Sequence, residues 1–154
     1  MKRLLTSAAV CLLAVTTFSV YAEDEKKDAA KAGPKCPVSG TPCKKEFAAD
    51  YKGAEVYFCC DKCPKAFAEN PEKFATKANL QLVQTKQAKQ TKCPLTGRDM
   101  ADDKTVAVNG VTVKLCCPNC LGKVTKAEGD AQLELVFSDK AFKQGFEVTA
   151  KKEK

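Results

Sequence analysis

The sequence predicts an α+β protein made of two small modules of one kind in tandem. A cysteine-rich pattern occurs twice, and its landmarks recur at a constant offset in the numbering. In each copy, alternating apolar and polar residues flank a turn signal, and a helix-like segment follows. A fixed internal period of this kind indicates a repeated structural unit. The landmarks that match across the two copies are Cys36 and Cys93, Gly40 and Gly97, Gly53 and Gly110, Cys59 and Cys116, and Cys63 and Cys120.

Residues 1–22 have the pattern of a signal peptide. Lys2 and Arg3 precede an uncharged, mostly apolar run, and small residues end it at Ala22. This pattern is typical of cleaved export signals, and the apolar run is short for a membrane span. Cys11 lies inside it and is expected to leave with it. We therefore expect a periplasmic or secreted protein with no membrane span after cleavage.

The rest of the chain divides by composition into modules and connecting segments. Modules of about 60 residues bury a modest core and often depend on a metal or a disulfide for stability. The expected segments are a flexible lead-in at 23–34, a first module at 35–84, a polar linker at 85–91, a second, shortened module at 92–150 and a tail at 151–154.

Each module is expected to open with a Cys-Pro-x-x-Gly turn and to continue into a β-hairpin. Proline fixes φ, and Gly40 and Gly97 can take positive φ. The hairpin turns are expected at Lys52-Gly53 and at Asn109-Gly110, and Asn-Gly is a strong hairpin signal. The resulting register assigns to the core face Phe47, Ala49, Tyr51, Ala54, Val56 and Phe58 in the first module and Val106, Val108, Val111, Val113 and Leu115 in the second.

Helix and strand signals follow the hairpin. A helix is expected to begin at Pro64 and to restart at Asn70-Pro71. The spacing of Phe67 and Phe74 suggests that they share one helical face. A short strand is expected at 80–83 and at the matching 133–136. Residues 140–148 are expected to pack back onto the second module.

The charge balance gives no support to nucleic-acid binding. The net charge is +7 for the whole chain and +5 without residues 1–22. Beyond the predicted signal, Arg98 is the one arginine, and the lysines are scattered rather than interleaved with aromatic residues. A tetrathiolate around a divalent cation carries about −2 by formal charge. A lysine-rich surface would help to tolerate two such sites.

The cysteine clusters are the candidate functional residues. Thiolates at a helix N-terminus are favoured by the helix dipole and by free N–H groups. Four of them can surround Zn²⁺, and two or three also suit Cu⁺. We therefore expect one ion per module and no nucleic-acid partner. The candidate ligands are Cys36, Cys59, Cys60 and Cys63 in the first module and Cys93, Cys116, Cys117 and Cys120 in the second.

Two other readings of the cysteines stay open. Export would favour disulfides, but adjacent cysteines bridge only with strain and nine cysteines leave one unpaired. The clusters could then belong to a non-catalytic interaction protein held together by structural zinc or disulfides. Cys60-x-x-Cys63 and Cys117-x-x-Cys120 could instead serve a thiol oxidoreductase. The chain lacks histidine and the βαβ context of such enzymes, so catalysis is not expected.

A family resemblance adds to this reading. The spacing of Cys36, Cys59 and Cys63 resembles that of TRASH domains, and the second copy repeats it. The segments Cys-Pro-Val-Ser-Gly, Tyr-Lys-Gly-Ala-Glu-Val-Tyr-Phe-Cys-Cys and Phe-Ala-Glu-Asn-Pro-Glu-Lys-Phe resemble the related YHS domain. The resemblance implies a treble-clef-like zinc-binding fold, found in proteins that sense, move or resist heavy metals, including appendages of copper-transporting ATPases. It implies heavy-metal buffering, trafficking or sensing, with metal ions and a metal transporter or another exported protein as partners.

The resemblance also implies three ligands in each module and leaves the fourth open. Carried over, the ligands are Cys36, Cys59 and Cys63, and likewise Cys93, Cys116 and Cys120. Related knuckles have a further cysteine where this chain has Ser39 and Thr96. Cys60 and Cys117 are the expected substitutes. Cys43 is a further candidate in the first module alone, because Met100 stands at its counterpart.

Overall fold

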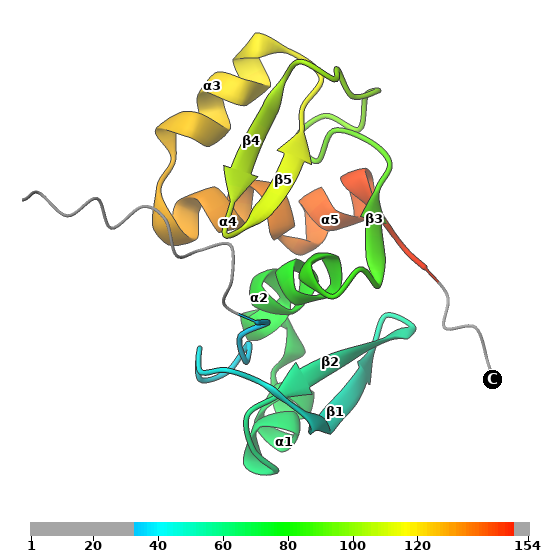
Figure 1. Cartoon of the computed structure of the whole chain (residues 1–154), viewed down its shortest axis with the longest axis vertical. Helices are drawn as coiled ribbons and strands as arrows, with labels where there is room; N and C mark the ends of the chain where they lie inside the picture. The colour runs from blue at the N-terminus through cyan, green and yellow to red at the C-terminus, as the bar shows by residue number, and fades with distance from the viewer. Residues whose placement is uncertain (1–32, 150–154) are drawn as a thin grey trace, which may run out of the picture.

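A computed structural model describes residues 33–149 (Figure 1). The predicted signal peptide, the lead-in before Gly33 and the C-terminal tail lie outside the described residues. Among the described residues, no helix has the length and apolar character needed to cross a membrane. The elements are mixed helices and small two-stranded sheets, which confirms the α+β class. They run in the order β1 (Lys44–Tyr51), β2 (Ala54–Phe58), α1 (Lys62–Glu69), α2 (Pro71–Gln84), β3 (Ala88–Gln90), β4 (Thr105–Val108), β5 (Val111–Lys114), α3 (Pro118–Lys126), α4 (Gly129–Phe137), α5 (Asp139–Gly145) and β6 (Phe146–Val148).

Both predicted hairpins are confirmed, with the predicted turns. β1 and β2 are antiparallel around Lys52 and Gly53, which have φ of 53° and 80°. β4 and β5 are antiparallel around Asn109 and Gly110, with φ of 46° and 79°. The alternation also holds, because the residues of the predicted core faces are buried or half-buried and most of those between them are more exposed. Each hairpin thus presents one apolar face to its own repeat.

The two short strands predicted after the hairpins are wrong. Residues 80–83 lie in α2, and residues 133–136 lie in α4. Helix α2 packs between the first hairpin and α4 (Figure 1), so the consecutive residues 78–82 are all buried. A helix covered on several sides loses the periodic polar stripe, and its apolar run then looks like a strand.

The segment between the repeats and the C-terminal segment make contacts that the sequence did not predict. The linker contains β3, which pairs antiparallel with β6. Helix α5 contacts α2 as well as α4, so the C-terminal segment packs on both repeats rather than on the second alone. Because α2 also packs against α4, the buried apolar residues of the two repeats form one continuous core.

The helical region of the first repeat breaks into two helices. Asn70 has φ −141° and separates α1 from α2, and Pro71 occupies the first turn of the new helix. Phe67 and Phe74 therefore lie on different helices, not on one helical face as predicted. Their rings still meet, with centroids 6.4 Å apart.

A polar cluster joins the first hairpin to the start of α5. Asn79 of α2 is fully buried, and its Nδ2 donates to the Phe137 carbonyl at 2.9 Å and to Asp139 Oδ1 at 3.0 Å. Lys52 Nζ donates to Asn79 Oδ1 at 2.9 Å and lies 2.7 Å from Asp139 Oδ1. The Tyr51 hydroxyl donates to the same carboxylate at 3.3 Å. The cluster therefore fixes the hairpin tip against the C-terminal helices.

Candidate metal centre

The first repeat brings three cysteine sulfurs together from three pieces of chain. Cys36 lies in the opening turn, which the Gly40 N–H closes by bonding to the Cys36 carbonyl at 2.8 Å. Cys59 follows β2 directly, and Cys63 lies in the first turn of α1. Their sulfurs all lie within 4.8 Å of one another. Turn, hairpin and helix start therefore converge on one point.

The second repeat builds the same cluster. The Gly97 N–H closes the opening turn on the Cys93 carbonyl at 2.8 Å. Cys116 follows β5, and Cys120 lies in the first turn of α3. The three sulfurs again lie within 4.8 Å of one another. The two triads correspond residue by residue at the constant offset found in the sequence.

The sulfur separations fit a shared metal ion. Cys59 and Cys63 sulfurs are 3.5 Å apart, and Cys116 and Cys120 sulfurs are 3.7 Å apart. Thiolates placed about 2.3 Å from a tetrahedral zinc ion lie about 3.8 Å from one another. A disulfide would need about 2.0 Å. All nine cysteines of the described residues are free thiols in this arrangement, so both triads have the donor chemistry and spacing of a thiolate metal site.

The candidate fourth ligands lie beside the triads and not within them. Cys60 Sγ is 3.8 Å from Cys59 Sγ and 3.5 Å from Cys63 Sγ, yet it does not belong to the set in which all sulfurs lie within 4.8 Å. Cys117 is also outside the corresponding set. Both are half-buried. Each triad is therefore complete as a three-sulfur set, with one further thiol at its margin.

Cys43 is directed to a different set of partners. Its thiol donates to the Tyr57 carbonyl at 3.0 Å, and Gln81 Nε2 donates to its sulfur at 3.2 Å. Burial, with the nearby charges of Cys36 and Cys59, raises the pKa of Cys43 to about 12. Hydrogen bonds therefore hold the Cys43 sulfur with Tyr57 and Gln81, outside the three-sulfur set.

Two hydroxyls next to the clusters were missed as site residues by sequence reasoning. Ser39 Oγ lies 3.2 Å from Cys59 Sγ, and Thr96 Oγ1 lies 3.2 Å from Cys116 Sγ. In the sequence, these two positions stand out only as places where related knuckles have a further cysteine. The signal that could have found them is that a hydroxyl residue occupies the matching position in both copies of the repeat.

The thiols of the first cluster differ in how easily they ionise. Hydrogen bonds from the Ser39 and Thr41 hydroxyls and from Cys63 lower the pKa of Cys59 to about 6. Burial raises the pKa of Cys63 well above its usual range, and its sulfur neighbours raise it further. One thiol thus ionises readily while the buried one resists.

The second cluster also combines a thiol of lowered pKa with a buried thiol of raised pKa, but here the lowered pKa belongs to the turn cysteine. Although burial opposes it, hydrogen bonds from Thr96 and from the backbone N–H groups of Cys116 and Leu95 lower the pKa of Cys93 to about 7. Burial, with its sulfur neighbours, raises the pKa of Cys120 to about 12. Several thiolates this close repel one another, and a bound cation removes that penalty.

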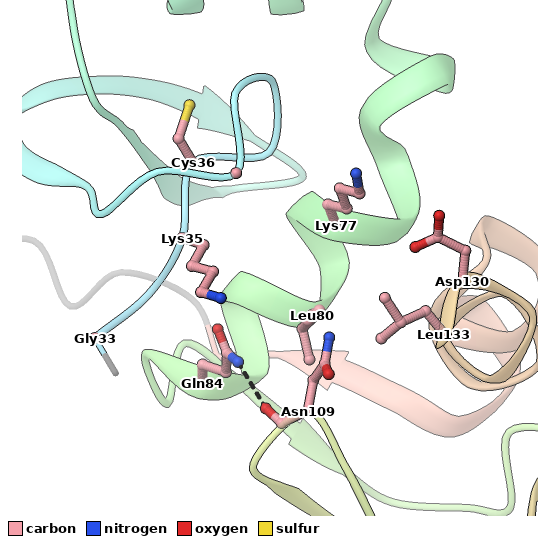
Figure 2. A pocket seen from close by; sticks show the side chains of 10 residues that line it. Gly33, Lys35, Cys36, Lys77, Leu80, Gln84, Asn109, Asp130 and Leu133 are labelled. Atoms are coloured by element: carbon pink, nitrogen blue, oxygen red, sulfur yellow. Dashed lines mark hydrogen bonds between the residues drawn. The ribbon is translucent and has the colours of Figure 1, made fainter. Parts of the chain in front are cut away.

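A pocket of about 450 Å³ lies beside the first cluster, between the opening turn, α2, α4 and the tip of the second hairpin. Lys35, Lys77 and Asp130 line it, and Gln84 Nε2 donates to the Asn109 carbonyl at 2.9 Å. Figure 2 shows the Cys36 sulfur pointing away from Lys35 and Gln84. The pocket therefore borders the backbone of the turn and is separate from the thiol cluster.

Comparison with known proteins identifies the first repeat. Residues 34–78 match the YHS domain family. The match includes the opening turn, the first hairpin, α1 and the first part of α2, and so the whole first cluster. The second repeat lies outside it. No curated protein and no solved structure matches the chain. The first repeat is therefore a YHS-type cysteine-rich domain.

Proposed function

We propose, from the YHS-type first repeat and the two three-sulfur clusters, that the chain is an exported metal-binding protein. It holds one Zn²⁺ or Cu⁺ ion in each cluster and serves heavy-metal buffering, trafficking or sensing. The observation that carries the proposal is the convergence, in each repeat, of three sulfurs lying within 4.8 Å of one another. Soft sulfur donors at this spacing select these ions.

The geometry of each cluster supports a proposed set of ligands. Cys36, Cys59 and Cys63 hold the first ion, and the corresponding triad holds the second. Cys60 supplies a fourth sulfur by a small shift, because it already lies 3.5 Å from Cys63 Sγ; Cys117 has that place in the second repeat. The turn, the hairpin and the helix N-terminus around each cluster support a treble-clef-like site.

The choice of ion depends on whether Cys60 or Cys117 binds it as a fourth ligand. A closed site of four thiolates favours zinc, and three thiolates also suit Cu⁺. The chain has no histidine to complete either site. The physiological partners are then metal ions and a metal transporter or another exported protein.

A second candidate function is a non-catalytic interaction protein with structural metal. The observation that favours it is the burial of Cys36, Cys63, Cys93 and Cys120, which slows exchange of a bound ion. An ion that exchanges within minutes with a chelator supports trafficking, whereas one released only on unfolding supports a structural role. The chain is not proposed to be an enzyme, and a test for insulin reduction would reveal a thiol oxidoreductase.

Native mass spectrometry of the anaerobically purified full chain tests the proposal. We expect two bound ions and no two-dalton losses from disulfide formation. Cys59→Ser and Cys116→Ser should each lose one ion, and the matched Cys43→Ser should keep both. A wild-type chain with no ion and with its thiols paired would refute metal binding.

A further inference from the structure

In each repeat, a glutamine side-chain amide pairs with the backbone of the residue two positions before Cys59 or Cys116, which we call the strand-end cysteines. Gln81 Oε1 accepts from the Tyr57 N–H at 2.6 Å, and its Nε2 donates to the Tyr57 carbonyl at 2.9 Å. Gln90 Oε1 accepts from the Lys114 N–H at 3.0 Å, and its Nε2 donates to the Lys114 carbonyl at 2.6 Å. In both repeats the paired residue lies two positions before the strand-end cysteine.

In each repeat, the same amide nitrogen also donates a hydrogen bond to the opening turn, which carries Cys36 or Cys93. Gln81 Nε2 donates to the Lys35 carbonyl at 3.1 Å, and Gln90 Nε2 donates to the Lys92 carbonyl at 3.0 Å. Lys35 and Lys92 directly precede the turn cysteines. One side chain thus connects the two pieces of chain whose sulfurs must meet.

The two glutamines reach equivalent positions from elements that are not equivalent. Gln81 lies in α2, after the first cluster, whereas Gln90 lies in β3, before the second cluster. They are close together in the chain and do not follow the constant offset that relates their partners. The same bridge between turn and strand is therefore made in both repeats, by a helix residue in the first and by a strand residue in the second.

We propose that Gln81 and Gln90 are positioning residues. Each sets the distance between the turn cysteine and the strand-end cysteine of its cluster, Cys36 and Cys59 for Gln81 and Cys93 and Cys116 for Gln90. The inference rests on the proposed metal binding. A whole hairpin separates each turn cysteine from its strand-end cysteine along the chain, so an ion can bind both only where the two segments are held in register. Groups that orient ligands in this way typically contribute about 10- to 100-fold to metal affinity.

Gln87 provides a matched control within the same protein. Its Oε1 accepts from the Glu55 N–H at 2.8 Å, and its Nε2 donates to the Glu55 carbonyl at 2.7 Å. It therefore pairs with the edge of β2 as Gln81 does. Its other side-chain bond goes to Thr85 and not to the opening turn, so it lacks the connection that the proposal requires.

The test replaces each glutamine by methionine, which keeps the side-chain length and removes the amide bonds. The reduced full chain and its variants are loaded with ¹¹³Cd²⁺ and studied by ¹¹³Cd NMR and by chelator competition. We expect two resonances in the wild type, of which Cys116→Ser identifies the second site. Gln90→Met should shift the second-site resonance and weaken that site about 10- to 100-fold. Gln81→Met should do the same to the first site.

The outcomes separate this inference from the proposed function. Gln87→Met should leave both resonances and both affinities unchanged. If Gln90→Met behaves like Gln87→Met, the positioning role is refuted while metal binding stands. Because Gln81 is buried, its loss can unfold the first repeat, and half-buried Gln90 then decides the question. A wild-type chain that takes up no Cd²⁺ overturns both proposals.

Discussion

Replacing Asn79 by alanine should destabilise the protein strongly for a single polar residue. The side chain is fully buried and makes three hydrogen bonds, to the Phe137 carbonyl, to the Asp139 carboxylate and from the Lys52 ammonium. It lies where the first hairpin meets the C-terminal helices. Its loss should therefore weaken the contact between the repeats as well as the local structure.

The magnitude follows from what the three bonds leave behind. A neutral hydrogen bond contributes about 0.5–1.5 kcal/mol net, and one to a charged group about 1.5–3 kcal/mol. Without Asn79, Lys52 and Asp139 still form their ion pair at 2.7 Å. Their side chains are 23% and 42% exposed, so water and this ion pair replace much of the lost hydrogen bonding. The buried Phe137 carbonyl loses a donor that alanine cannot replace. We expect a decrease of about 2–4 kcal/mol in the free energy of unfolding.

Urea unfolding at a fixed, saturating metal concentration measures the effect, because a bound ion would itself add to stability. The matched control is Asn70→Ala. Asn70 is exposed and makes no side-chain capping bond, so that change should stay within about 0.5 kcal/mol of the wild type. If Asn79→Ala costs no more than Asn70→Ala, the cluster does not join the repeats and the reasoning fails.

Three further predictions concern packing, pH and thiol ionisation. A Cβ at Gly145 would lie 2.7 Å from the backbone of the turn that opens the second repeat, so Gly145→Ala should lower the free energy of unfolding by about 1–3 kcal/mol in a thermal unfolding assay. In the same assay the control Gly122→Ala, whose Cβ would enter open space on α3, should be neutral or stabilising. Although burial opposes it, hydrogen bonds and the neighbouring Lys52 ammonium lower the pKa of Asp139. The carboxylate therefore stabilises the fold above the usual carboxyl pKa of about 3.9, and this stabilisation is lost as pH falls through the lowered pKa. Asp139→Asn should flatten the acid limb of a plot of unfolding free energy against pH, and an unchanged slope would contradict this. Ser39→Ala removes the main hydrogen bond to Cys59 and should raise its pKa from about 6 toward that of an ordinary thiol, which alkylation of the metal-free protein against pH and peptide mapping would detect as a shifted midpoint.

The opening turns and hairpins could be predicted from sequence because their determinants are local. Gly40 and Gly97 adopt φ of 74° and 68°, as a turn closing on the preceding cysteine requires. Asn109 and Gly110 fix a two-residue turn, and that turn fixes the register of β4 with β5. Turn and register bring together the three matching cysteines of each repeat, whereas Cys60 and Cys117, also expected as ligands, lie outside the three-sulfur sets.

The features that could not be predicted from sequence depend on contacts between segments that are distant in the chain. β3 exists because β6 pairs with it, and nothing within residues 88–90 indicates that partner. The same holds for Gln81, Gln90 and Asn79, which look like ordinary polar residues until their backbone partners are known.

The sequence by itself determined the opening turns, the hairpins and the three matching cysteines of each repeat, because each depends on residue type and on spacing over a short stretch of chain. Only the tertiary structure decided that residues 80–83 and 133–136 are helical, that the repeats share a core and which glutamine amides bridge the turn and the strand of each repeat. The physical reason is burial: it hides helical periodicity where α2 is covered on several sides, and it gives a polar side chain a role only through partners that folding brings near.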